Sequence, residues 1–97
     1  MSNVGFSAYS IDGTSNATLT LCRGSTYTFT MSATGHPFWI KTVQGIGTAN
    51  AYMDGVTGNG SATGTITFVV AGNAPGQLFY NCQFHGAMTG NINIVDP

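Results

Sequence analysis

Apolar and polar residues alternate with a period of two along much of the chain, and this pattern predicts short β-strands. In residues 26–31, for example, Tyr27, Phe29 and Met31 alternate with threonines. The strands predicted in this way cover residues 4–10, 18–22, 26–31, 36–43, 64–70, 78–82 and 91–95. No apolar period typical of a helix persists along the chain, so no helix is predicted.

Turn-forming residues separate the predicted strands. Asp12-Gly13, residues 23–25 and Pro75-Gly76 mark tight turns. Around residues 23–25 the flanking strands are expected to form either a hairpin or one strand with a corner. Residues 44–63 are expected to form a loop, with any helical turn near residues 48–53. Regular turns between short strands predict an all-β fold, a Greek-key β-sandwich or barrel of about seven to eight strands.

Composition limits the size and the partners of this fold. The chain has 97 residues, which suits one domain over residues 1–97. Charged residues make up 5% of the chain, and the net charge is −1. Nucleic acid is therefore not expected as a partner, because phosphate binding needs clustered Lys and Arg. No run of apolar residues is long enough to span a membrane.

The first residues carry no signal-peptide pattern, since "MSNVGFSAYS" lacks a basic start and an apolar core. The chain is expected to be either a mature form or a domain of a longer protein.

Three residues with metal-binding side chains follow one predicted strand in the segment "YNCQFHGAMTG". Cys82, His85 and Met88 are each separated by two residues, so a tight loop can turn all three side chains toward one point. A thiolate, an imidazole and a thioether together favour copper. A blue copper centre also needs a second histidine, and His36 is the only other one in the chain. Zinc is the rival metal, but it prefers carboxylates to Met, and no acidic residue lies near this loop.

Taken singly, each of these four residues has a plainer interpretation. A lone Cys or Met is most often a buried apolar side chain, and a lone His is most often structural or exposed. Their joint spacing favours the metal site. Cys22 is expected to be a buried free thiol, because a disulfide with Cys82 would abolish the site.

The other residues that could carry chemistry receive structural interpretations. Phe38 and Trp39 are expected to pack between the sheets, although one of them could shield the metal. Met31 and Met53 are expected in the core or a loop. The two cations of the chain, Arg23 and Lys41, are expected at solvated strand ends.

With these four residues, the chain resembles the cupredoxins, the single-domain blue copper proteins. The resemblance runs from "LCRGSTYTF" through "GHPFWI" and "GTITFVV" to "LFYNCQFHGAMTGNINIV". Plastocyanin and pseudoazurin have longer spacings from His to Met, and the short loop seen here is similar to that of amicyanin. The resemblance implies that His36, Cys82 and His85 are equatorial ligands of copper and that Met88 is the axial ligand.

One position departs from the cupredoxin pattern. The residue after the first ligand histidine is usually Asn, whose amide helps to hold the Cys sulfur, whereas Pro37 has no N–H to donate. We expect the amide of Phe84 to replace that donor, as in azurin-like loops. Hydrogen bonds to the thiolate tune the reduction potential.

The resemblance implies a type 1 (blue) copper protein that carries one electron, with one copper ion cycling between Cu(I) and Cu(II). A redox partner protein is expected to dock on an apolar patch around His85, and the chain is expected to be a monomer and not an enzyme. Its expected location is the periplasm or the extracellular space. Two alternatives are a copper-binding or copper-delivery module, and a structural β-sandwich of a larger surface or particle protein with vestigial metal binding.

Overall fold

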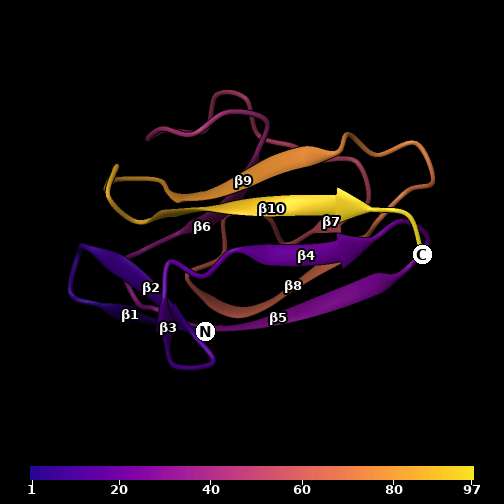
Figure 1. Ribbon diagram of the computed structural model, residues 1–97. Helices are drawn as coiled ribbons and strands as arrows, with labels where there is room; N and C mark the ends of the chain where they lie inside the picture. Colours follow the sequence, from indigo (N-terminus) through magenta and orange to yellow (C-terminus); the bar gives the residue numbers. More distant parts are fainter.

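The chain folds into two β-sheets that face each other, as seen in a computed structural model that describes residues 1–97 (Figure 1). The strands are β1 (Ser2–Val4), β2 (Ala8–Ile11), β3 (Thr14–Ser15), β4 (Leu19–Cys22), β5 (Thr26–Ser32), β6 (Phe38–Lys41), β7 (Val56–Thr57), β8 (Thr63–Val69), β9 (Gln77–Cys82) and β10 (Thr89–Val95). There is no helix. The predicted all-β sandwich is confirmed, and the strands outnumber the prediction because β1, β3 and β7 are pieces of two or three residues.

The chain passes back and forth between the two sheets, so strands that are consecutive in sequence often lie in different sheets. One sheet has the order β3-β2-β1-β5-β8-β7, and the other has the order β4-β10-β9-β6. β4 and β5 therefore belong to different sheets, so the turn between them is a corner rather than a hairpin. Gly24 has a φ of 84° and lets the chain turn there, where the amide of Ser25 donates to the Cys22 carbonyl at 3.2 Å.

The strand predicted over residues 4–10 is wrong, because the chain reverses in its middle. Gly5 has a φ of 55°, and the amide of Ser7 donates to the Val4 carbonyl at 3.2 Å. β1 and β2 then pair as antiparallel neighbours, with Val4 opposite Ala8. Alternation alone did not reveal this turn, since the apolar residues keep their spacing across it. The turn leaves Phe6 70% exposed.

The core consists of the inward side chains of both sheets. Buried residues from β5 and β8 face buried residues from β9 and β10, among them Phe29, Met31, Ile66, Phe68, Leu78, Tyr80, Ile92 and Ile94. Near the candidate site the core contains three aromatic rings. Phe38 stacks on Tyr80 with ring centroids 5.0 Å apart, and Tyr9 meets Phe38 edge to face at 5.1 Å. Each such pair contributes about 0.5–1.5 kcal/mol beyond its burial.

Trp39 was expected to pack between the sheets, but it does not. Phe38 does so and is fully buried, and alternation along β6 then turns Trp39 to the outer face. There the Trp39 ring is half-buried against Gly60, and its Nε1–H donates to Gln83 Oε1 at 3.0 Å.

The interpretation of Lys41 as a solvated strand end is also wrong. Lys41 ends β6 but is only 1% exposed. Its ammonium group lies under the loop that begins at residue 44 and donates to three carbonyls of that loop. The predicted loop over residues 44–63 is confirmed apart from the short strand β7 and the first residue of β8. Residues 48–53 contain no helical turn.

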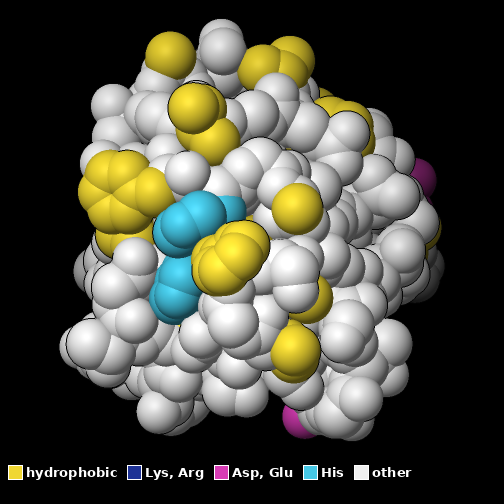
Figure 2. Space-filling model, turned by 90° about the vertical axis from the view of Figure 1, so that its left-hand side faces the viewer, with side chains coloured by type: hydrophobic (Ala, Val, Ile, Leu, Met, Phe, Trp, Pro, Cys, Tyr) yellow, Lys and Arg dark blue, Asp and Glu magenta, His cyan; other side chains and the backbone are white.

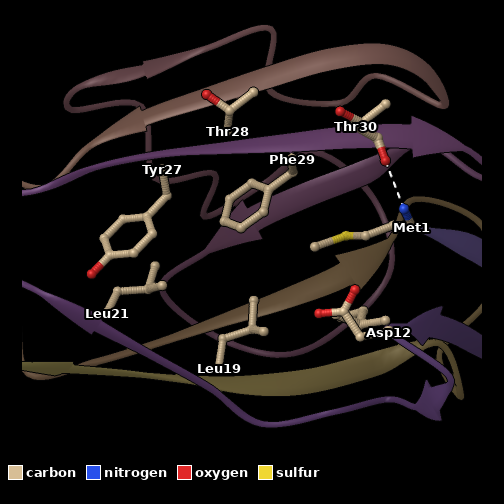
Figure 3. A pocket seen from close by; sticks show the side chains of 9 residues that line it. Met1, Asp12, Leu19, Leu21, Tyr27, Thr28, Phe29 and Thr30 are labelled. Atoms are coloured by element: carbon tan, nitrogen blue, oxygen red, sulfur yellow. Dashed lines mark hydrogen bonds between the residues drawn. The ribbon is translucent and has the colours of Figure 1, made fainter.

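A groove of about 380 Å³ opens between β4 and β5 (Figure 3). Leu19, Leu21 and Phe29 line it, and at its edge the Met1 ammonium donates to the Thr30 carbonyl at 2.6 Å. None of the four candidate ligands lines this groove. No element of the structure is a helix long and apolar enough to cross a membrane.

Candidate metal centre

The candidate ligands meet at one end of the sandwich. Cys82 is the last residue of β9, His85 lies in the turn between β9 and β10, and Met88 directly precedes β10. His36 lies just before β6, whose Phe38 pairs with Cys82 across the sheet. This register explains why a histidine 46 residues before the cysteine arrives beside it.

Three ligand atoms converge on one point. Nδ1 of His36 lies 3.8 Å from Sγ of Cys82, and Nδ1 of His85 lies 3.5 Å from the same sulfur. The three ligand atoms all lie within 4.8 Å of one another. The structure therefore brings together the predicted cluster of His36, Cys82 and His85.

These distances suit a metal bound between the three atoms. Metal–nitrogen bonds of about 2.0 Å and metal–sulfur bonds of about 2.3 Å, set at trigonal angles, place the nitrogens about 3.7 Å from the sulfur. A trigonal set of two histidines and one cysteine is the equatorial arrangement of blue copper sites. No Asp or Glu belongs to the cluster, so a fourth ligand of the kind that zinc favours is missing.

Burial differs among the four residues. Cys82 and Met88 are completely buried, whereas His36 and His85 are partly exposed. The sulfur is thus shielded from water while the histidine edges reach the surface. Met88 is the last residue of the loop and its side chain is buried, and its role as a fourth ligand stays a prediction.

Hydrogen bonds within the loop fix its shape. The Cys82 amide donates to the Met88 carbonyl at 2.9 Å, and the Met88 amide donates to the His85 carbonyl at 3.2 Å. From inside, the Asn81 side-chain amide donates to the Cys82 carbonyl at 2.9 Å and to the His85 carbonyl at 3.4 Å. The seven-residue loop is short and well tied, which limits how far its side chains can move.

His36 is held by a residue that the sequence did not indicate. The hydroxyl of Tyr9 donates to the His36 carbonyl at 2.7 Å, and the His36 amide donates to the Ala33 carbonyl at 2.9 Å. Burial and the nearby Cys82 thiol raise the pKa of Tyr9, so its hydroxyl stays protonated and keeps donating. The local sequence pattern does not predict this contact, because the two residues are 27 positions apart.

The expected hydrogen bond from the Phe84 amide to the sulfur is not formed. The Cys82 sulfur instead contacts Nδ1 of His36 at 3.8 Å and Nδ1 of His85 at 3.5 Å. The residue before Phe84 connects the loop to the segment that contains His36. The amide of Gln83 donates to the Pro37 carbonyl at 3.0 Å. Pro37 therefore contributes its carbonyl to the site, in place of the amide that it lacks.

The two histidines lie side by side on a face with little charge (Figure 2). Their ring centroids are 5.0 Å apart, and the ring of Phe6 lies 5.8 Å from that of His85. Ile46 lies beside Gly86, and the exposed Phe84 adjoins His85 in the chain. We call Phe6, Ile46, Phe84 and the two histidines the histidine face. No Lys or Arg side chain is visible in this view.

Cys22 lies at the other end of the sandwich. It is a free thiol, as expected, but it is half-buried at the end of β4 and not fully buried. Its partner in register is Val95, near the C-terminus and far along β10 from the metal loop. A disulfide between Cys22 and Cys82 is not present.

Comparisons with known proteins support the same fold. No family model and no curated protein matches the chain. The 1.27 Å structure of rusticyanin from Thiobacillus ferrooxidans matches with a TM-score of 0.58 and 26% identity over 86% of this chain. A structure of reduced rusticyanin matches with a TM-score of 0.57 and 24% identity over 86% of this chain. The chain spans 64% and 65% of these two proteins.

Rusticyanin is a cupredoxin, and the cluster of two histidines and one cysteine fits a blue copper site. The resemblance to the cupredoxins is therefore confirmed, whereas the ligand roles of the individual residues and the amicyanin-like type of the loop stay predictions.

Proposed function

We propose that this cupredoxin-like chain binds one copper ion and carries single electrons between redox proteins. The observation that supports the proposal most strongly is the convergence of one ring nitrogen of His36, Sγ of Cys82 and one ring nitrogen of His85 within 4.8 Å. Copper bound there would supply the Cu(I)/Cu(II) couple. Met88, buried in the same loop, is proposed as the axial ligand in an amicyanin-like short loop.

The protein contributes a site whose geometry changes little. Cys82 and Met88 are tied together through the backbone at 2.9 Å, and Tyr9 fixes His36. Because these contacts join protein groups to one another, they can hold the proposed ligands in place before and after an electron arrives. Four proposed ligands leave no position for a substrate, so we propose that the chain is not an enzyme.

Electrons are proposed to enter and leave through His85. Its ring is partly exposed on the histidine face, whereas the sulfur of Cys82 is fully buried. The face is apolar and carries few charges, so docking there should be brief and depend weakly on salt. We also propose that the chain is a monomeric single domain and works in the periplasm or outside the cell.

The test is the visible spectrum after one equivalent of Cu(II) is added. A strong absorption band from a cysteine-to-copper transition is expected in the wild-type protein and should disappear in Cys82→Ser. Cys22→Ser is the matched control, since it removes the other thiol at the far end of the molecule. A colourless wild-type protein, or the same spectrum in Cys82→Ser, would refute the proposal.

A further inference from the structure

Outside the ligand cluster, Lys41 is a buried cation without an anionic partner. It is 1% exposed, and the only ion pair of the structure joins Arg23 to Asp96. Taking an ammonium group out of water is costly unless its three N–H donors are satisfied. An apolar residue at this position would avoid that cost, so the buried lysine is expected to have a specific role.

Three consecutive carbonyls satisfy the ammonium. Nζ of Lys41 donates to the carbonyls of Gly45 at 2.7 Å, Ile46 at 3.4 Å and Gly47 at 3.2 Å. Three successive carbonyls converge in this way only when the backbone changes direction at each step. Gly45 has a φ of 137° and Gly47 a φ of 88°, conformations that favour glycine.

This segment, residues 44–47, forms a strap along the metal loop. The amide of Gly45 donates to Asn81 Oδ1 at 3.2 Å, and the amide of Gly47 donates to the Gln83 carbonyl at 2.8 Å. The side chain of Gln44 donates to Thr89 Oγ1 at 3.1 Å. The strap is therefore attached before, within and after the loop that carries Cys82, His85 and Met88.

Asn81 connects the strap with the ligands. Its oxygen accepts from Gly45, and its nitrogen donates to the carbonyls of Cys82 and His85. A continuous set of hydrogen bonds thus runs from the Lys41 ammonium through the strap to the backbone of two candidate ligands.

Lys41 also lies close to Cys82 along the sheet. Lys41 pairs with Phe79 on β9, three residues before Cys82, which corresponds to about 10 Å along the strand. Interactions over such a distance are screened less inside a protein than in water. A buried cation favours the more negative state of the site, which is the state that holds the extra electron.

From these contacts we propose that Lys41 is a positioning residue of the metal centre, which clamps the strap of residues 44–47 onto the ligand loop and raises the reduction potential. The clamp does not depend on bound copper, whereas the effect on the potential rests on the proposed function.

The first measurement uses the metal-free protein, so it stands apart from the proposed function. In Lys41→Met the amides of Gly45 and Gly47 should exchange with solvent at least about tenfold faster, while core amides such as that of Ile66 keep their rates. Arg23→Met is the matched control, because it removes the only other Lys or Arg of the chain, at the opposite end of the sandwich. Unchanged exchange at Gly45 and Gly47 in Lys41→Met would overturn the clamp.

The second measurement is the reduction potential of the copper-loaded protein, which a purely structural role would not shift in a defined direction. Lys41→Met should lower the potential, and Arg23→Met should leave it near the wild-type value. A potential that is unchanged or raised in Lys41→Met, or lowered equally by both substitutions, would overturn the electrostatic role.

If Lys41→Met does not fold, Gly47→Ala tests the strap with the lysine still in place. The added methyl meets no atom within 4 Å, so only the positive φ is strained. The Gly45 amide should again exchange faster than in the wild type, and wild-type exchange there would contradict the proposal.

Discussion

The hydroxyl of Tyr9 donates a 2.7 Å hydrogen bond to the backbone carbonyl of His36, and this contact joins the N-terminal hairpin to the candidate metal centre. Tyr9 is completely buried and His36 is partly exposed, so this hydrogen bond lies at the edge of the core. The orientation of His36 therefore depends on a strand that contains no candidate ligand.

Tyr9→Phe should weaken both the fold and the metal site. Loss of the hydroxyl removes the hydrogen bond to the His36 carbonyl and should lower the free energy of unfolding by about 0.5–1.5 kcal/mol, measured by urea denaturation of the metal-free protein. Copper affinity should also fall, because His36 is less well oriented. Tyr27→Phe is the control: it removes a hydroxyl that binds the Cys22 amide at 2.8 Å, far from the metal loop. Equal copper affinity in both variants would contradict this role of Tyr9.

Met88→Leu should preserve the blue colour and change the reduction potential. Leucine has a similar volume, so this buried position should lose less than about 1.5 kcal/mol of stability. The weak axial ligand tunes the potential, whereas the colour arises at the cysteine. Voltammetry and the visible spectrum of the copper-loaded variant check both points. The same potential in both proteins would mean that Met88 is not the axial ligand.

Gly90→Ala should destabilise the sandwich beneath the metal loop. A methyl group at Gly90 would overlap the phenol of Tyr80, which is fully buried and donates to the Ala17 carbonyl at 2.6 Å. The ring cannot move away without breaking that hydrogen bond, so a loss of about 1–3 kcal/mol or more is expected in thermal or urea unfolding. Gly72→Ala meets nothing within 4 Å and should remain close to wild type. Similar stabilities for the two variants would show that Tyr80 can adapt.

Stability should fall as the pH rises above 10. Burial raises the pKa of Tyr80 from 10.0 to about 12, so the folded protein keeps this proton after the unfolded chain has lost it. The unfolded state then binds fewer protons than the folded state, and stability decreases with pH across this interval. Below pH 10 the contribution of Tyr80 is fully present. Urea midpoints of the metal-free protein between pH 9 and 12 measure the effect, and Tyr80→Phe should make the decline shallower.

Phe84→Ser should slow electron exchange between copies of the protein in the Cu(I) and Cu(II) states. Phe84 is 58% exposed beside His85, so the substitution removes apolar contact area without disturbing the core. Val95→Ser, at the far end of β10, is a control that should keep the wild-type rate. The rate should vary little with salt, because the chain has so few charges. Equal rates for the two variants would show that the proteins do not dock through the surface around His85.

The sequence by itself determined the class of fold and the members of the ligand cluster. Alternation with a period of two gave most of the strands, and Cys82 and His85 were recognisable because their side chains suit copper and lie three residues apart. His36 could be added because it was the only remaining histidine. These inferences depend on local spacing and on the chemistry of single side chains, and both are readable without coordinates.

Only the tertiary structure decided what supports the cluster. The pairing of Phe38 with Cys82 brings His36 to the sulfur, and the contact from Tyr9 spans the gap between two sheets. Lys41 looked like an exposed strand end, yet the strap of residues 44–47 covers it. Such contacts join residues that are distant in the chain or depend on how a glycine-rich loop folds back, so their physical cause lies in packing and hydrogen bonding rather than in local sequence.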